Sequence, residues 1–133
     1  MSKVERRSAN GQTNGYAGRD ELRKACERKF TEVRVSDVGR YRLRSLNERE
    51  RSRIDMLVHG DASKPLEERT SEYKARLLAA TLVDSEGKLL FTQNKDDLDF
   101  LQELNTSVAS TIGDAVVKHC GLAEGAVEDA EKN

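Results

Sequence analysis

The chain has 133 residues, of which 36% are hydrophobic, 35% are charged and only 5% are aromatic. This length fits one domain, with or without loose ends, and the lean composition supports a single small apolar core of modest stability. The net charge of −1 conceals a polarity, because residues 1–59 carry 15 Lys and Arg against 9 Asp and Glu, whereas residues 60–133 carry 8 against 15. A basic and an acidic part of this kind could attract anionic partners, or could bring protomers together basic end to acidic end.

The first segment, residues 1–18, is rich in Ser, Asn, Gly and Gln and has almost nothing to bury, so we expect a flexible polar arm. Asp20 then suits a helix N-cap. Leu22, Ala25, Cys26 and Phe30 follow at helical spacing and predict a first helix over about residues 20–30.

Residues 32–35 and 40–44 alternate in polarity around a turn at 37–39, which predicts a β-hairpin. Strand side chains point alternately to opposite faces. We therefore expect one apolar face and one arginine face. The apolar face would hold Val33, Val35, Tyr41 and Leu43, and the other would hold Arg34, Arg40, Arg42 and Arg44.

A helix is predicted over about residues 46–58, opened by a capping box between Ser45 and Glu48 and ended by residues 59–61. Its inward residues would be Leu46, Ile54, Leu57 and Val58. Ser63 and Pro65 are typical of the start of the next helix.

That next helix carries Leu66, Tyr73, Leu77 and Leu78 on one face and continues without a linker into a second hairpin-like pattern. The hairpin would consist of residues 81–83, a turn at 84–87 and residues 89–91. We expect Leu77, Leu82 and Phe91 in the core.

Residues 94–97 can cap a long core helix, along which apolar residues recur every three or four positions. These residues are Leu98, Leu101, Leu104, Val108, Ile112 and Val116. Gly121 suits the left-handed position after the helix. Residues 123–133 would form an acidic short helix or a frayed tail. The prediction is an α+β, predominantly helical domain over residues 19–122, with about four helices and one or two short β-hairpins.

The sequence contains no clear catalytic motif, so we do not expect an enzyme. His59 and His119 lack a persuasive catalytic setting, and Cys26 and Cys120 are expected to be buried free thiols rather than a disulfide. No metal site is expected, because the two Cys and two His do not cluster and the acidic residues Asp96, Asp97 and Asp99 suit a helix N-terminus.

No phosphate-binding glycine motif occurs, so no cofactor is predicted. There is no signal-peptide pattern and no apolar run near 18 residues, so we expect a soluble, cytosolic protein without a membrane contact.

Arginines at positions 34, 40, 42, 44, 49, 51 and 53 could meet phosphates. Acidic residues interleave with those of the helix, and no exposed aromatics accompany them for base stacking. Nucleic acid is therefore the less favoured partner, and contact with an acidic protein or protomer is the better use of the charge.

Three segments resemble the tail assembly chaperones of long-tailed bacteriophages: FTEVRVSDVGRYRLRSLNERERSRID from Phe30 to Asp55, YKARLLAATLVDSEGKLLFT from Tyr73 to Thr92, and the stretch from Leu98 to the acidic ending LAEGAVEDAEKN. Together they cover 82 of the 133 residues. The order of short hairpin, capped helix, helix into a second hairpin and long helix is similar to that of the family.

The resemblance implies a non-catalytic protein that coats the tape measure protein, helps recruit tail tube subunits in the host cytoplasm and is absent from the finished virion. It also implies that a longer form could arise by translational frameshifting, and the ending Glu131-Lys132-Asn133 could be encoded by a slippery A-AAA-AAC heptamer. The alternative is a small nucleic-acid-binding regulatory protein that uses the arginine face.

The expected partners are the tape measure protein and the tail tube protein, with self-association possible. The candidate partner-binding residues lie on the strand face and in the acidic end: Arg34, Arg40, Arg42, Arg44, Val127 and Glu128.

Overall fold

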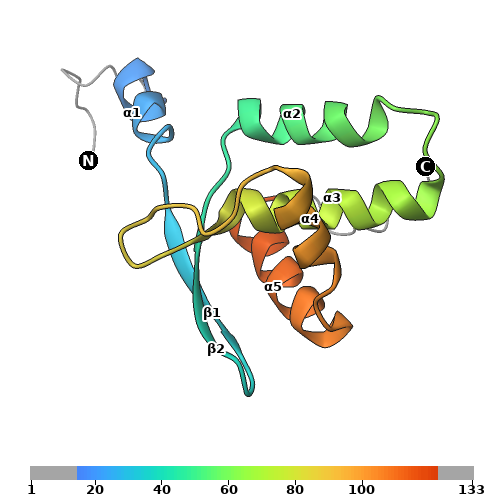
Figure 1. The fold of residues 1–133 in the computed structure, drawn as a ribbon. Helices are drawn as coiled ribbons and strands as arrows, with labels where there is room; N and C mark the ends of the chain where they lie inside the picture. Colours follow the sequence, from blue (N-terminus) through green and yellow to red (C-terminus); the bar gives the residue numbers. More distant parts are fainter. Residues whose placement is uncertain (1–14, 123–133) are drawn as a thin grey trace.

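The computed structural model describes residues 15–122, and the fold within them is α+β and predominantly helical, as the sequence predicts. Five helices accompany a three-stranded antiparallel sheet in this part of the chain (Figure 1). In chain order the elements are α1 (Arg19–Lys24), β1 (Phe30–Val35), β2 (Gly39–Arg44), α2 (Glu48–His59), α3 (Leu66–Thr81), β3 (Leu82–Val83), α4 (Lys95–Gln102) and α5 (Thr106–His119).

The strand order is β1-β2-β3, and the register of the first pair sets Val33 opposite Tyr41 and Arg34 opposite Arg40. β3 has only two residues and pairs with β2 at Arg42 and Leu43 alone. The far half of the hairpin is consequently a two-stranded ribbon, which extends past the helices in Figure 1.

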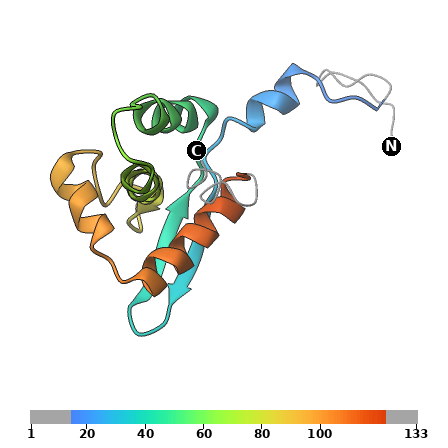
Figure 2. The ribbon, with the colours of Figure 1, turned by 90° about the vertical axis from the view of Figure 1, so that its right-hand side faces the viewer.

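The core lies between one face of the hairpin and the helices. α5 crosses that face (Figure 2), where Leu43 is completely buried. Val58 of α2, Leu78 of α3 and Val116 of α5 are each no more than 1% exposed and belong to the same cluster. The predicted facing of the hairpin is confirmed. Its apolar side joins the core through Val33, Val35, Tyr41 and Leu43.

The first helix is much shorter than predicted. α1 ends at Lys24, Gly18 takes the N-cap position in place of Asp20, and Phe30 belongs to β1. α1 buries no residue, and Leu22 is 72% exposed. Both views show α1 standing apart from the helical body (Figures 1 and 2). The prediction of a helix to residue 30 was wrong because, among the described residues, no element buries the apolar face of α1.

α2 begins two residues later than predicted. Asn47, not Ser45, is the N-cap: its side chain accepts a hydrogen bond of 2.8 Å from the Glu50 N–H, and the Glu50 carboxylate accepts one of 3.0 Å from the Asn47 N–H. The Ser45 hydroxyl instead accepts a bond from the backbone of Lys29, at the start of the hairpin. Leu57 was predicted to point inward but is 46% exposed.

The predicted second hairpin is much smaller than expected. β3 joins the sheet beside β2, and its return strand is limited to an isolated bridge between Val83 and Leu89. Gly87 closes the intervening turn with φ of +84°, and its N–H donates to the Asp84 carbonyl oxygen. Leu77 and Leu82 are buried, and Phe91 packs against the core, as predicted.

The predicted long core helix is two helices. α4 ends at Gln102 and α5 begins at Thr106, with Asn105 in the N-cap position between them. The end of α5 matches the prediction: Gly121 has φ of +68°, and the Leu122 N–H donates to the Val117 carbonyl oxygen, as in a Schellman motif.

Both cysteines are free, but only Cys120 is partly buried, and Cys26 is exposed, contrary to the prediction of two buried thiols. Between residues 15 and 122 no helix has both the length and the apolar character that a membrane span requires. Residues 1–14 of the arm predicted over residues 1–18 fall outside the described residues, as do the predicted acidic ending and its candidate residues Val127 and Glu128.

Candidate partner-binding surfaces

The four arginines of the hairpin share one face, but the structure divides them into two pairs. Arg42 and Arg44, at the base, bind their own chain. The Arg42 guanidinium lies 4.1 Å from the centre of the Phe30 ring and donates a 2.8 Å hydrogen bond to the Ser85 carbonyl oxygen. Arg44 Nε donates to the Ala80 carbonyl oxygen at 2.8 Å. These two residues hold the 80–90 region against the sheet.

Arg34 and Arg40 lie directly opposite each other on the far half of the ribbon, and both are exposed. Arg40 pairs with Glu32 at 3.2 Å, in a contact with both side chains more than half exposed. Arg34 makes no hydrogen bond or ion pair with any residue of the described segment. The sequence predicted all four hairpin arginines as partner-binding residues, but of these only the outer pair, Arg34 and Arg40, is available to a partner.

A carboxylate at the base of the hairpin organises the surrounding arginines. Glu50 accepts two hydrogen bonds from Arg28, at 2.6 and 2.8 Å, and one from Arg44 at 3.1 Å. The hydrogen bonds from Arg28 are the main reason that the pKa of Glu50 is lowered, in opposition to burial. Burial lowers the pKa of Arg44, and the charge of Glu50 opposes that shift. The cluster joins the segment before β1 to the end of β2 and the start of α2.

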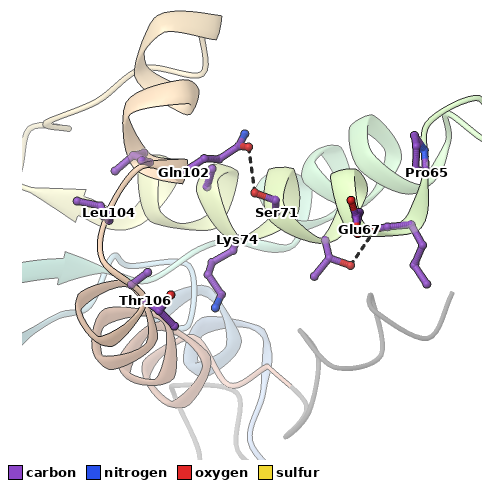
Figure 3. A pocket seen from close by; sticks show the side chains of 12 residues that line it. Pro65, Glu67, Ser71, Lys74, Gln102, Leu104 and Thr106 are labelled. Atoms are coloured by element: carbon purple, nitrogen blue, oxygen red, sulfur yellow. Dashed lines mark hydrogen bonds between the residues drawn. The ribbon is translucent and has the colours of Figure 1, made fainter.

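A groove lies where α3, α4 and α5 meet (Figure 3), with a volume of about 750 Å³. Its apolar floor includes Leu66 and Ala75 of α3, Leu101 of α4, and Leu104 and Ala109 at the corner and start of α5. Leu101 and Ala75 are almost completely buried, whereas Leu104 is half-buried. Among the described residues, the groove therefore has an apolar floor on which Leu66 and Leu104 are the more exposed members.

Polar side chains form the rim of the groove. The Ser71 hydroxyl of α3 donates a 2.9 Å hydrogen bond to the Gln102 side chain of α4, and Figure 3 shows the two pointing toward each other. Lys74 extends from α3 on the side that α5 forms, near Thr106. Glu67 completes the charged part of the lining. An apolar floor with a mixed polar rim suits one face of an amphipathic helix.

An aromatic pair with one exposed ring lies outside this groove. Phe91 and Phe100 stack with ring centres 5.7 Å apart, and Phe100 is 55% exposed. Leu89 and Leu90, just before Phe91 in the chain, are nearly half exposed. This segment and α4 thus add apolar surface to the C-terminal half of the chain.

The remaining chemical candidates have structural contacts. The His59 ring lies 5.6 Å from the Tyr73 ring, and His119 Nε2 lies 3.0 Å from the Lys29 carbonyl oxygen, to which it can donate. Burial raises the pKa of the Cys120 thiol. Asp97 accepts two hydrogen bonds from Thr92. Among the described residues no group of His, Cys, Asp and Glu could hold a metal ion.

Sequence reasoning missed the groove because it joined α4 and α5 into one helix. A signal for the break between the helices was present, because Asn105, Thr106 and Ser107 are residue types that favour helix N-caps, although the apolar spacing continues across them. Comparisons with protein-family models, curated proteins and solved structures found no match to this chain.

Proposed function

We propose that this protein is a non-catalytic tail assembly chaperone of a long-tailed bacteriophage, which binds the tape measure protein and helps recruit tail tube subunits. Its site of action would be the host cytoplasm, and it would be absent from the mature virion. The proposal starts from the resemblance of the hairpin, the capped helix and the 73–92 segment to that family. Gene order offers a first test, because a tape measure gene should follow closely.

The observation that carries the proposal is the groove between α3, α4 and α5. Its floor is apolar, with Leu66 and Leu104 partly exposed, and its rim supplies hydrogen-bonding groups from Ser71, Gln102 and Thr106. A holding protein needs such a surface, because it must cover apolar segments of an unassembled partner without reacting with them. We propose that an amphipathic helical segment of the tape measure protein is the occupant.

The outer half of the hairpin favours a second candidate function. A two-stranded ribbon can enter the major groove of DNA, and Arg34 and Arg40 would meet phosphates there. This supports the alternative of a small nucleic-acid-binding regulator. Binding to DNA or RNA that weakens steeply with added salt, and disappears when both arginines are replaced by Gln, would favour this candidate over the chaperone.

Co-expression with the tape measure protein of the same genome tests the first candidate. The wild-type chain should keep that protein soluble and should co-purify with it. Ser71→Arg places a long charged side chain in the groove and should abolish both effects. Ser52→Arg on α2 is the matched control, because Ser52 is also an exposed helical serine that donates a hydrogen bond, in its case to Glu48.

The outcomes separate clearly. Loss of co-purification with Ser71→Arg but not with Ser52→Arg supports the groove as the docking site. Equal binding by both variants, with each folded by circular dichroism, would remove the groove from the proposal. Failure of the wild-type chain to associate with the tape measure protein would overturn the chaperone function itself.

A further inference from the structure

Within residues 15–122, the outer edge of β1 has no strand paired to it. β1 is the terminal strand in the order β1-β2-β3, and no other described strand lies beside its second edge. The Ser45 N–H donates to the Lys29 carbonyl oxygen at 2.8 Å, which fixes the phase of the ladder. Because ladder bonds alternate along an antiparallel pair, Thr31, Val33 and Val35 bond toward β2. The backbone groups of residues 30, 32 and 34 therefore point outward.

The charged side chains at this edge are only partly paired with opposite charges in the described part of the chain. Arg34 faces Arg40 across the hairpin, and like charges in opposite positions destabilise a sheet. Glu32 reaches Arg40 diagonally, so Arg34 has no carboxylate partner among residues 15–122. Glu32 and Arg34 lie two positions apart on the same exposed face of an edge strand. A strand with this pattern is complementary to itself in the antiparallel direction.

We propose that β1 is a self-association edge, which pairs antiparallel with β1 of a second copy about a two-fold axis at Val33. In this register each Glu32 lies opposite Arg34 of the second copy, so two cross-strand ion pairs form. Val33 lies opposite its own equivalent and Thr31 opposite Val35, which places β-branched residues together on the other face. The two sheets become one continuous sheet of six strands.

The charges select this register over its neighbour. The outward backbone groups at residues 32 and 34 also permit a two-fold axis at Glu32, but that register sets Glu32 against Glu32 of the second copy. Like charges in directly facing positions disfavour that pairing. The register about Val33 instead places each Glu32 opposite Arg34 of the second copy, so both cross-strand pairs are favourable. A two-fold edge pair is also closed, so the contact ends at a dimer. This surface is separate from the groove and does not depend on the proposed partner.

Charge reversal on the full chain tests the edge directly. Arg34→Glu places a carboxylate opposite Glu32 of the second copy, and Glu32→Arg places a guanidinium opposite Arg34 of the second copy. Each variant should weaken the dimer by about tenfold or more, since two favourable pairs become two repulsive ones. Sedimentation velocity over a wide range of protein concentration measures the change. Arg49→Glu, a substitution of an exposed arginine of α2, makes the same charge change away from the edge and should leave the dimer intact.

Two restorations make the test specific. An equimolar mixture of the Arg34→Glu and Glu32→Arg chains should form a heterodimer, because every cross-strand pair is again opposite in charge. The double variant carrying both substitutions should regain the homodimer. Circular dichroism confirms that each variant is folded. A wild-type chain that stays monomeric at all concentrations would overturn the proposal, and so would a dimer that is insensitive to Arg34→Glu or single variants that do not restore each other.

Discussion

Replacing Glu50 by Gln tests whether the arginine face of the hairpin is chiefly a structural device. The carboxylate accepts hydrogen bonds from Arg28, from Arg44 and from the Asn47 N–H, so it connects three segments. Gln can still accept from Asn47 and preserve the cap of α2, but it removes the charge that both arginines contact. The substitution thus separates the ion cluster from the helix cap.

The magnitude follows from the burial of the three side chains. Glu50 is 27% exposed, Arg28 32% and Arg44 17%, so the cluster lies between a surface ion pair and a buried one. Exposed pairs contribute roughly 0.2–1 kcal/mol, and breaking a buried pair costs roughly 3–5 kcal/mol. We expect Glu50→Gln to lower the free energy of unfolding by about 2 kcal/mol. Glu50→Ala also loses the cap and should cost about 1 kcal/mol more.

The stability that Glu50 contributes should depend on pH in a definite direction. Hydrogen bonds from Arg28 lower the pKa of Glu50 in the folded state, so the unfolded chain binds more protons near that pKa. The stabilisation is therefore complete above the unfolded value of about 4.3 and is lost as the pH falls through the folded pKa. The difference between wild type and Glu50→Gln should be largest near neutral pH and should close in acid.

Urea unfolding followed by circular dichroism, at neutral pH and in acid, measures both effects. Glu48→Gln is the control, because Glu48 lies in the same helical turn but its partners among residues 15–122 are the neighbouring Arg51 and Ser52, and it is mostly exposed. It should change stability little. If Glu50→Gln behaved like Glu48→Gln, or if its effect were independent of pH, the cluster would not stabilise the base of the hairpin.

Three further substitutions test individual parts of the fold, each by urea unfolding. Leu43→Ala should cost about 3 kcal/mol, because Leu43 is completely buried where the hairpin meets α5, and a destabilisation below about 1 kcal/mol would contradict that packing. Asn94→Ala should cost about 1 kcal/mol and Asn105→Ala clearly less, because only Asn94 makes a side-chain cap bond; the reverse order would contradict these caps. Gly121→Ala should cost about 1 kcal/mol, since Gly121 is left-handed, and a neutral result would refute the Schellman end of α5.

The hairpin and its facing could be predicted because alternation specifies which side of a strand each residue takes. The partners of the arginines could not. Arg42 and Arg44 bind the carbonyl oxygens of Ser85 and Ala80, which lie 43 and 36 residues away in the chain. Such contacts depend on how α3 and the following turn return to the sheet, which no local pattern specifies. The sequence therefore predicted the arginine face but not that its inner half is occupied.

The break between α4 and α5 shows a different limit. Leu98, Leu101, Leu104, Val108 and Ile112 keep a spacing of three or four residues across the corner, so periodicity alone continues one helix through it. α4 and α5 each bury their apolar residues against a common core. Such burial requires the three- or four-residue spacing within each helix, but it does not require the two helices to share one straight axis. The groove could only be found from the tertiary structure, because it forms where that axis turns.

The positions of the two proposed surfaces make their functions separable. The groove is built from α3, α4 and α5, all in the acidic half of the sequence, whereas the open edge belongs to β1 in the basic half. Edge pairing consumes backbone groups of β1 and leaves the groove side chains untouched, so a dimer would present two grooves. A partner with repeated helical segments would then bind the wild-type dimer more tightly than the Arg34→Glu chain, even though Arg34 lines no part of the groove.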